Sequence, residues 1–261
     1  GTVTANSIAR LYISPSYTAS IGISGTPLQM EIDEMYFDSA TTSAAQYIHI
    51  LGSGTPDVYV DGAKTGTALV LSGDIDNLIV SSTFAGTLIL GNSASLPAVP
   101  VNVYWLSTSG TLDCTTAGTS GLDWAASGKL FILNGTVNLG DNVGAGGVIN
   151  VSGGTVNVSV WTKTTTDVLN IYGGTVKWTA GTNTNSGSDV IDTISEVNLY
   201  GGTFTTAGNS SAYLCFDDIN QFGGTLNLQA DLPNTKIDGT LTRFGGTFTP
   251  QNTSTLTATA K

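Results

Sequence analysis

A short motif recurs through most of this chain: two glycines and a threonine, set between stretches in which apolar and polar residues alternate. Its clearest copies read INVSGGTVNV, VLNIYGGTVKW, EVNLYGGTFT, INQFGGTLNL and LTRFGGTFT, and looser copies with one glycine before the threonine begin near residue 63. The first and last of these glycines are separated by eight intervals, with a mean of 22.5 residues. The glycines that precede threonine in these copies are Gly66, Gly86, Gly110, Gly135, Gly154, Gly174, Gly202, Gly224 and Gly246.

This spacing and this alternation together predict the fold. A repeat of 20 to 50 residues is typical of solenoids, propellers and other arrays, and alternation with period two indicates strands. A propeller blade needs about 40 residues, and the repeats show no helical period. We therefore expect an all-β chain, a single-stranded parallel β-helix (β-solenoid) of about nine rungs. The alternative is an antiparallel sandwich in which GGT is a hairpin turn, but the regular spacing favours the β-helix.

Each part of the motif has a physical role in such a helix. Glycine reaches positive φ without steric cost, and a glycine pair lets the chain bend where neighbouring coils approach closely. The threonines are expected to stack into a ladder along one edge. The 28-residue interval from Gly174 to Gly202 contains an extra stretch, 179–189, which we interpret as a protruding loop. The aromatic residues before the glycine pairs are expected to stack in the same way: Tyr172, Tyr200, Phe222 and Phe244.

The repeat divides the chain into three segments. Residues 1–65 lack the motif, and we interpret them as irregular β structure that caps the first coil or docks on a partner, because an open end exposes strand edges. Residues 66–250 form the parallel β-helix. Residues 251–261 are a polar tail, either a frayed end or an arm that lies along a neighbouring subunit.

Composition excludes some classes of partner. The chain has 261 residues, a net charge of −11 and eight lysines and arginines, which argues against nucleic acid because phosphate contacts need clustered cations. No basic amphipathic helix offers a membrane surface. The two cysteines, Cys114 and Cys215, would lie at least about four rungs apart, roughly 19 Å, whereas a disulfide needs Cα atoms within about 7 Å. We expect two free, buried thiols.

The sequence offers little chemistry, and we assign no catalytic, cofactor-binding or metal-binding residue. The one histidine, His49, lies in an alternating strand and is interpreted as structural. Paired carboxylates can hydrolyse glycosides, but the chain has few cations to hold an acidic substrate, and no calcium-binding loop motif occurs. We interpret the acidic clusters as solvated turns: Asp74 with Asp76; Asp189, Asp192 and Glu196; and Asp217 with Asp218.

The tryptophans are the remaining candidates for ligand contacts. Exposed indoles would stack on sugars, but packing in the core or at corners is commoner for tryptophan. We expect core or corner positions for all of them: Trp105, Trp124, Trp161 and Trp178.

The rungs INVSGGTVNV and NIYGGTVKW resemble those of two groups of proteins, over roughly residues 63–250. One is the β-helical passenger domains of bacterial autotransporter adhesins. The other is the β-solenoid structural proteins of tailed bacteriophages: head decoration (cement) proteins, fibres and tailspikes. The resemblance is one of fold and carries over no catalytic residue. A short acidic column fits a phage coat accessory protein better than the much longer autotransporter arrays.

Three functions follow as hypotheses. The resemblance implies a non-enzymatic virion structural protein, a capsid decoration protein on the capsid exterior that binds the major capsid protein or other virion proteins, with a homotrimer as one arrangement. The second hypothesis is a surface-exposed adhesin or fibre that binds a receptor or glycan. The third is a polysaccharide-processing enzyme that would depend on Asp189 or Asp192. We favour the first, with no cofactor, nucleic acid or membrane involved.

Overall fold

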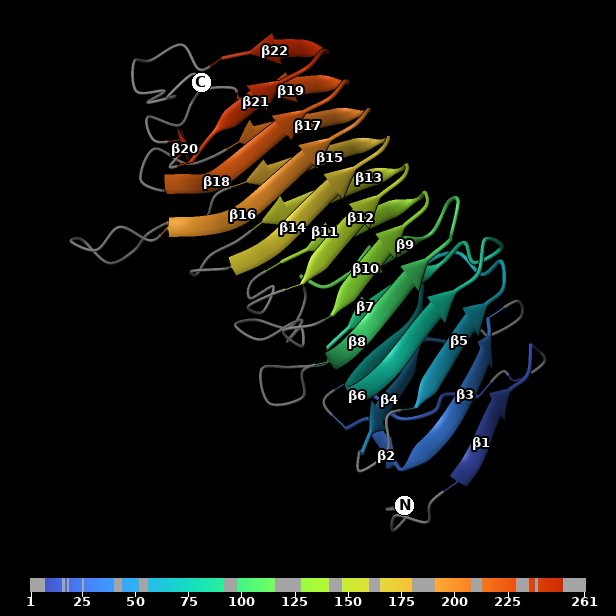
Figure 1. Ribbon diagram of the computed structural model, residues 1–261. Coiled ribbons are helices and arrows are strands. Elements are labelled where there is room, and N and C mark those ends of the chain that lie inside the picture. The colour runs from blue at the N-terminus through green and yellow to red at the C-terminus, as the bar shows by residue number, and fades with distance from the viewer. Residues whose placement is uncertain are drawn as a thin grey trace.

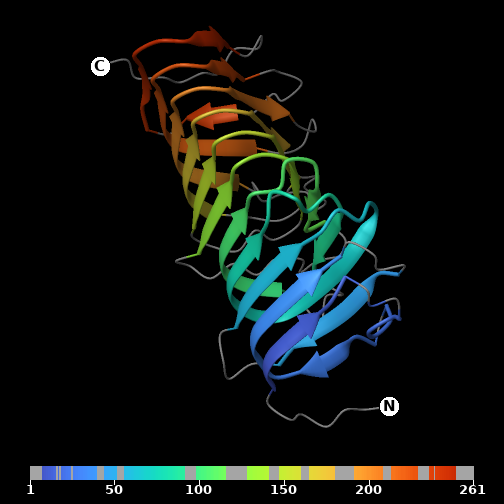
Figure 2. The same ribbon diagram turned by 90° about the vertical axis from the view of Figure 1, so that its right-hand side faces the viewer.

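The structure is a computed structural model, and every regular element in its described part is a β-strand. The strands form a column along which the chain advances from β1 to β22, with its two ends at opposite ends of the column (Figures 1 and 2). The residues that the structure describes are 8–15, 17, 19–24, 26–39, 44–51, 56–91, 98–115, 128–140, 147–159, 165–179, 191–207, 213–228, 235–237 and 239–250.

Two rows of strands form two sides of the column, which we name face A and face B. In face A the strands that follow one another are β1 (Ile8–Ile13), β3 (Ile32–Asp38), β5 (Asp57–Asp61), the end of β6 (Thr67–Val80), β8 (Ala98–Trp105), β10 (Lys129–Ile132), β12 (Val148–Val151), β14 (Thr165–Ile171), β16 (Ile191–Leu199), β18 (Tyr213–Gln221) and β21 (Leu241–Arg243). A further strand, β20 (Thr235–Ile237), pairs with the start of β18.

In the coils that carry the motif, the strands of face B begin directly after the glycine that precedes threonine. The strands of face B are β2 (Leu28–Met30), β4 (Gln46–Ile50), the start of β6, β7 (Thr87–Leu90), β9 (Thr111–Asp113), β11 (Thr136–Leu139), β13 (Thr155–Ser159), β15 (Thr175–Thr179), β17 (Thr203–Ala207), β19 (Thr225–Asn227) and β22 (Thr247–Thr249).

The pairings confirm the predicted parallel β-helix. Every pairing between named strands is parallel, and each strand pairs with its equivalents in the coils before and after it. Among the described residues the only antiparallel contact is an isolated bridge from Ile23 to Thr26. The sandwich alternative, which needs antiparallel neighbours, is therefore wrong. Nine successive strands of face B begin at a threonine of the motif, in agreement with the nine rungs expected.

The glycine seam between face A and face B forms as the motif predicted. The amide of Thr175 donates to the carbonyl of Gly154 at 2.9 Å, and the amide of Thr203 donates to that of Gly174, also at 2.9 Å. Gly174 has a φ of 74°. A Cβ on it would lie 2.6 Å from the backbone carbon of Gly153, so glycine is required both by conformation and by space. Of the nine glycines before threonine, all but Gly86 and Gly110 share the positive φ.

The threonine ladder is also confirmed. The threonine that begins each strand after the seam lies in register with the one in the next coil, so one row runs up face B. This row consists of Thr67, Thr87, Thr111, Thr136, Thr155, Thr175, Thr203, Thr225 and Thr247.

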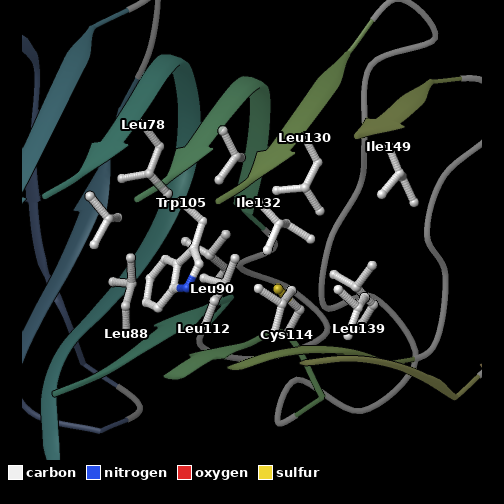
Figure 3. Close-up of a cluster of buried hydrophobic side chains, with 14 of the residues drawn as sticks. Leu78, Leu88, Leu90, Trp105, Leu112, Cys114, Leu130, Ile132, Leu139 and Ile149 are labelled. Carbon is white, nitrogen blue, oxygen red and sulfur yellow. The ribbon is translucent and has the colours of Figure 1, made fainter. Parts of the chain in front are cut away.

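A continuous apolar core fills the column, because alternate residues of both faces point inward. Figure 3 shows Leu78, Trp105 and Leu130 from face A meeting Leu88 and Leu112 from face B. Trp105 is fully buried, as is Trp178, so both lie in the core as expected. Trp124 and Trp161 lie outside the described residues.

The cysteines are far apart, as predicted. Cys114 follows β9, and its thiol is buried and free, with burial raising its pKa well above the ordinary value. Cys215 lies in β18, five coils further along, about 24 Å at the usual spacing between strands. No disulfide can join positions at that separation.

The N-terminal segment continues the column below the repeats. Strands β1 to β5 pair in parallel with the strands above them, and the irregular part is the connection from β1 to β2. Gln46 holds this connection: its side chain accepts from the Ile21 amide at 2.5 Å and donates to the Ala19 carbonyl at 3.1 Å. The tail, 251–261, and most of the loop 179–189 lie outside the described residues.

The apolar core ends in a polar pair at the C-terminal end. Gln221 and Arg243 continue the inward row of Leu199, and Gln221 is fully buried. The Arg243 guanidinium donates from Nε to Gln221 Oε1 at 2.8 Å and lies over the Phe248 ring, 4.9 Å from its centroid. This pair closes the last described coil with satisfied polar groups.

Candidate functional site

The two carboxylates of the acidic cluster on β6 have different surroundings. Asp74 is exposed, whereas Asp76 is half-buried and accepts a hydrogen bond from Asn77 at 3.3 Å. The other hydrogen bond of the Asn77 amide goes to Asp57 in the coil below, at 2.7 Å. These contacts link successive coils, so their observed role is structural.

Two carboxylates on β16 and β18, those of Glu196 and Asp218, accept hydrogen bonds from neighbouring residues. Asp218 accepts hydrogen bonds from the Thr240 amide at 2.8 Å and the Thr240 hydroxyl at 2.7 Å, which fix the turn before β21. Those hydrogen bonds lower the pKa of the Asp218 carboxyl. Glu196 lies in register with Asp218 and accepts from Asn220 at 3.3 Å. The neighbouring Asp217 is exposed.

Asp189 lies outside the described residues, and for Asp192 only the backbone, paired with Leu214, is described. Over the described ranges, no group of three or more His, Cys, Asp or Glu residues could hold a metal ion.

His49 makes a contact that resembles a nucleophile and its base. Its Nδ1 lies 3.0 Å from the Ser72 hydroxyl in the next coil. Ser72, however, is fully buried, so no substrate can reach its oxygen. Burial lowers the pKa of His49, and the field of Asp74 offsets part of that effect. The pair is a half-buried polar contact between coils, consistent with the structural interpretation of His49.

The most distinctive surface feature is an aromatic stack at the corner where face A meets the glycine seam, which we name the corner ladder. Its rings lie face to face in successive coils, with centroids 4.9, 4.8 and 5.0 Å apart and interplanar angles of 5° or less. All four rings are well exposed: Tyr172 (52%), Tyr200 (43%), Phe222 (42%) and Phe244 (70%).

A second ladder of asparagine side chains runs beside the corner ladder, two residues earlier on each strand of face A. Each amide donates from Nδ2 to Oδ1 of the asparagine in the coil below, at 3.0 to 3.1 Å. The ladder consists of Asn150, Asn170, Asn198 and Asn220. Because each amide is already satisfied by its neighbour, the row is stiff and electrically neutral.

No family model, no curated protein and no solved structure matches this chain. Within the described part of the chain, no helix is long and apolar enough to cross a membrane.

The ring geometry decides which ligands suit the corner ladder. A sugar binds an aromatic ring by lying on its face, but stacking at 4.8 to 5.0 Å covers the inner faces of the ladder. Phe244 at the upper end and Tyr172 at the lower end are well exposed, and each has only one stacked ring among the described residues, so each has one ring face that the ladder does not cover. The ladder therefore presents a ridge of ring edges, which suits packing against apolar side chains of a protein.

Sequence reasoning anticipated the corner ladder but missed a second aromatic row on face A. Tyr12, Tyr36 and Tyr59 lie in register on β1, β3 and β5, and the last two stack at 4.7 Å. The signal was present: Glu34-Met-Tyr36-Phe-Asp38 and Asp57-Val-Tyr59-Val-Asp61 share one pattern, offset by 23 residues, close to the repeat length.

Proposed function

We propose that the protein is a non-enzymatic structural protein of a virion, a decoration protein that docks along a phage capsid and stiffens the shell. The β-helical fold is compatible with a structural or adhesin-like protein. The observation that carries the more specific proposal is the corner ladder: a straight ridge of aromatic edges on a column whose coils pair throughout. A ridge of this kind suits a long contact with several protein subunits.

The rigidity of the column supports this role. Neighbouring coils are joined by backbone pairing along the described column, and four of them also by the asparagine ladder, and these contacts restrict movement between coils. A rigid partner loses little conformational entropy on binding, and binding to the assembled shell stabilises both partners by mass action.

The adhesin alternative rests on the same exposed rings. A receptor-binding fibre could use them against a protein receptor, whereas a glycan would find only the outer faces of the two end rings, Tyr172 and Phe244, open within the described ladder. A glycan array therefore separates the two ideas. Binding that falls when Phe244 is replaced by serine supports the adhesin, and the absence of glycan binding is expected for the decoration protein.

The direct test is the composition of intact particles purified from the natural source of the chain. Quantitative mass spectrometry is expected to find the chain at a fixed ratio to the shell subunit. Particles that lack the chain are expected to lose integrity at lower temperature, and adding back the purified chain should restore it. Absence of the chain from particles, or a ratio that varies between preparations, contradicts the proposal.

A pair of variants tests the surface itself. Changing Tyr200 and Phe222 to serine removes the middle of the corner ladder, and we expect at least a tenfold loss of occupancy on particles. The control is Lys177→Ser, an exposed position on β15 in face B, which should bind normally. Circular dichroism of both variants confirms that the column is folded. Equal occupancy of the two variants would place the contact elsewhere.

A further inference from the structure

The N-terminal half of face A carries an apolar stripe that no part of the preceding proposal uses. One outward residue from each of six successive coils lies in register, and the rings of Tyr36 and Tyr59 stack at 4.7 Å, those of Tyr104 and Phe131 at 5.1 Å. We name this row the tyrosine stripe: Tyr12, Tyr36, Tyr59, Ile79, Tyr104 and Phe131. At about 4.8 Å per coil it is roughly 24 Å long.

The stripe is open to solvent, most of all at its lower end. Tyr12 is 65% exposed and Tyr36 36%, and the remaining members are half-buried. Above Phe131 the same row continues as the neutral asparagine ladder, since Phe131 pairs with Asn150. The apolar stripe is therefore confined to the coils from β1 to β10, and it is long enough for an extended segment of about seven residues.

Carboxylates flank the stripe on both sides. Glu34 and Asp57 lie in register on one side of the tyrosines, and Asp38 and Asp61 on the other. Arg10 pairs with Glu34 at 2.5 Å. The groups bound to Asp57 and Asp61 are neutral: the amide of Asn77 for the first, and the hydroxyls of Ser81 and Thr83 with the amide of Gly62 for the second.

This arrangement concentrates negative charge on both sides of the tyrosines. Like charges placed directly opposite one another in neighbouring strands destabilise a sheet. Asp38 lies beside Asp61 in this way, and Glu34 beside Asp57, where the Arg10 guanidinium offsets part of the repulsion; Tyr36 and Tyr59 lie between the two pairs. The net charge of −11 adds to the negative field, so it repels a second copy of the chain and attracts a basic partner.

We propose that the tyrosine stripe is a docking face for an extended, basic protein segment whose apolar side chains pack on the tyrosines while lysines or arginines reach the flanking carboxylates. Alternate residues of an extended strand point to the same side, so apolar residues at every second position match an apolar stripe. The long cationic side chains between them can bend toward the acids on either side. This surface is distinct from the corner ladder, and the inference holds whether or not the protein belongs to a particle.

The test uses the full chain and three synthetic twelve-residue peptides. The first alternates lysine with leucine, the second alternates glutamate with leucine, and the third alternates lysine with serine. Fluorescence anisotropy at low salt is expected to show binding of the first peptide, with affinity that falls as salt is raised. The glutamate peptide should not bind, and the lysine and serine peptide should bind at least tenfold more weakly than the first.

Matched variants separate the docking face from general attraction to an acidic protein. Tyr59→Ser should weaken binding of the lysine and leucine peptide at least tenfold, and the double change Asp38→Asn with Asp57→Asn about threefold to tenfold. Asp217→Asn removes an exposed charge from the remote strand β18 and should change the affinity less than twofold. Equal losses from the double change and from Asp217→Asn, no effect of Tyr59→Ser, or binding of the glutamate peptide would each overturn the proposal. Failure of the lysine and leucine peptide to bind the folded chain would do the same.

Discussion

At the scale of single residues, the seam glycines can meet two requirements, a positive φ and a lack of space for a Cβ, and two positions separate them. Gly174 needs both a positive φ and the absence of a Cβ, whereas Gly66 has a φ of 81° with nothing within 4 Å of an added Cβ. The two positions therefore differ in packing while sharing the conformational demand.

We expect Gly66→Ala to lower the free energy of unfolding by about 1 kcal/mol, the cost of the left-handed conformation alone. Gly174→Ala should cost about 3 kcal/mol or more, because the new methyl group meets backbone atoms that cannot turn aside. Urea denaturation of both variants gives the comparison. Equal losses would show that conformation, and not the close approach of coils, makes glycine necessary at the seam.

Three single residues also make the stability of the folded protein depend on pH. Burial lowers the pKa of His49, and hydrogen bonds from Ser81 and Thr83, and from Thr240, lower those of Asp61 and Asp218. A lowered folded-state pKa contributes stability above the unfolded-state value, and that stability is lost as the pH falls. The histidine contribution is therefore lost below about pH 6.5, and the aspartate contributions below about pH 4.

His49→Gln should accordingly reduce the drop in melting temperature between pH 7.5 and pH 5.5, and leave the further drop toward pH 3 unchanged. Asp218→Asn should show the opposite pattern, since its carboxyl is ionised throughout the upper range. Thermal unfolding at the three pH values measures both effects. If His49→Gln leaves the drop in melting temperature between pH 7.5 and pH 5.5 unchanged, another group causes that drop.

At the scale of elements, the asparagine ladder joins four strands that are separated by whole coils in the sequence. Asn170, in the middle, donates to Asn150 and accepts from Asn198, whereas Asn150, at the lower end, takes part in one bond of the ladder. Both side chains are half-buried, so an unpaired amide keeps only part of its contact with water.

Asn170→Ala should therefore destabilise the protein by about 2 kcal/mol and Asn150→Ala by about 1 kcal/mol, at roughly 1 kcal/mol for each bond lost. Chemical denaturation of the two alanine variants provides the test, and a folded far-ultraviolet spectrum is required of each. If both variants lose the same stability, water replaces the ladder bonds and the row contributes no rigidity.

At the scale of the whole molecule, the described strands of each coil pair only with strands of the coils next to it. Stability in such an array is close to a sum of coil and interface contributions, so local opening begins where a coil has one neighbour. Hydrogen exchange should show the slowest amides in β12 to β15 and faster exchange in β1, β21 and β22. Uniform protection along the column would mean that the chain opens as one unit.

How much of this molecule the sequence predicts depends on the scale of the feature. The period of the motif predicted the parallel coils, the seam and the threonine row, because one physical requirement repeats at every corner. The tyrosine stripe was missed because it begins in coils that lack the motif, although Tyr36 and Tyr59 lie 23 residues apart. The burial of Ser72 beside His49, and the turn that Asp218 holds, depend on packing between coils and leave no trace in the local sequence.

The nine threonines in register mark successive coils at a regular spacing along the column. Each passage of the chain through the seam raises the polypeptide by about 4.8 Å, so a residue's number determines its height along the axis. Two chemical labels, one at the start of β11 and one at the start of β19, would therefore lie four coils apart along the axis. The column can therefore serve as a molecular ruler for distances along its axis.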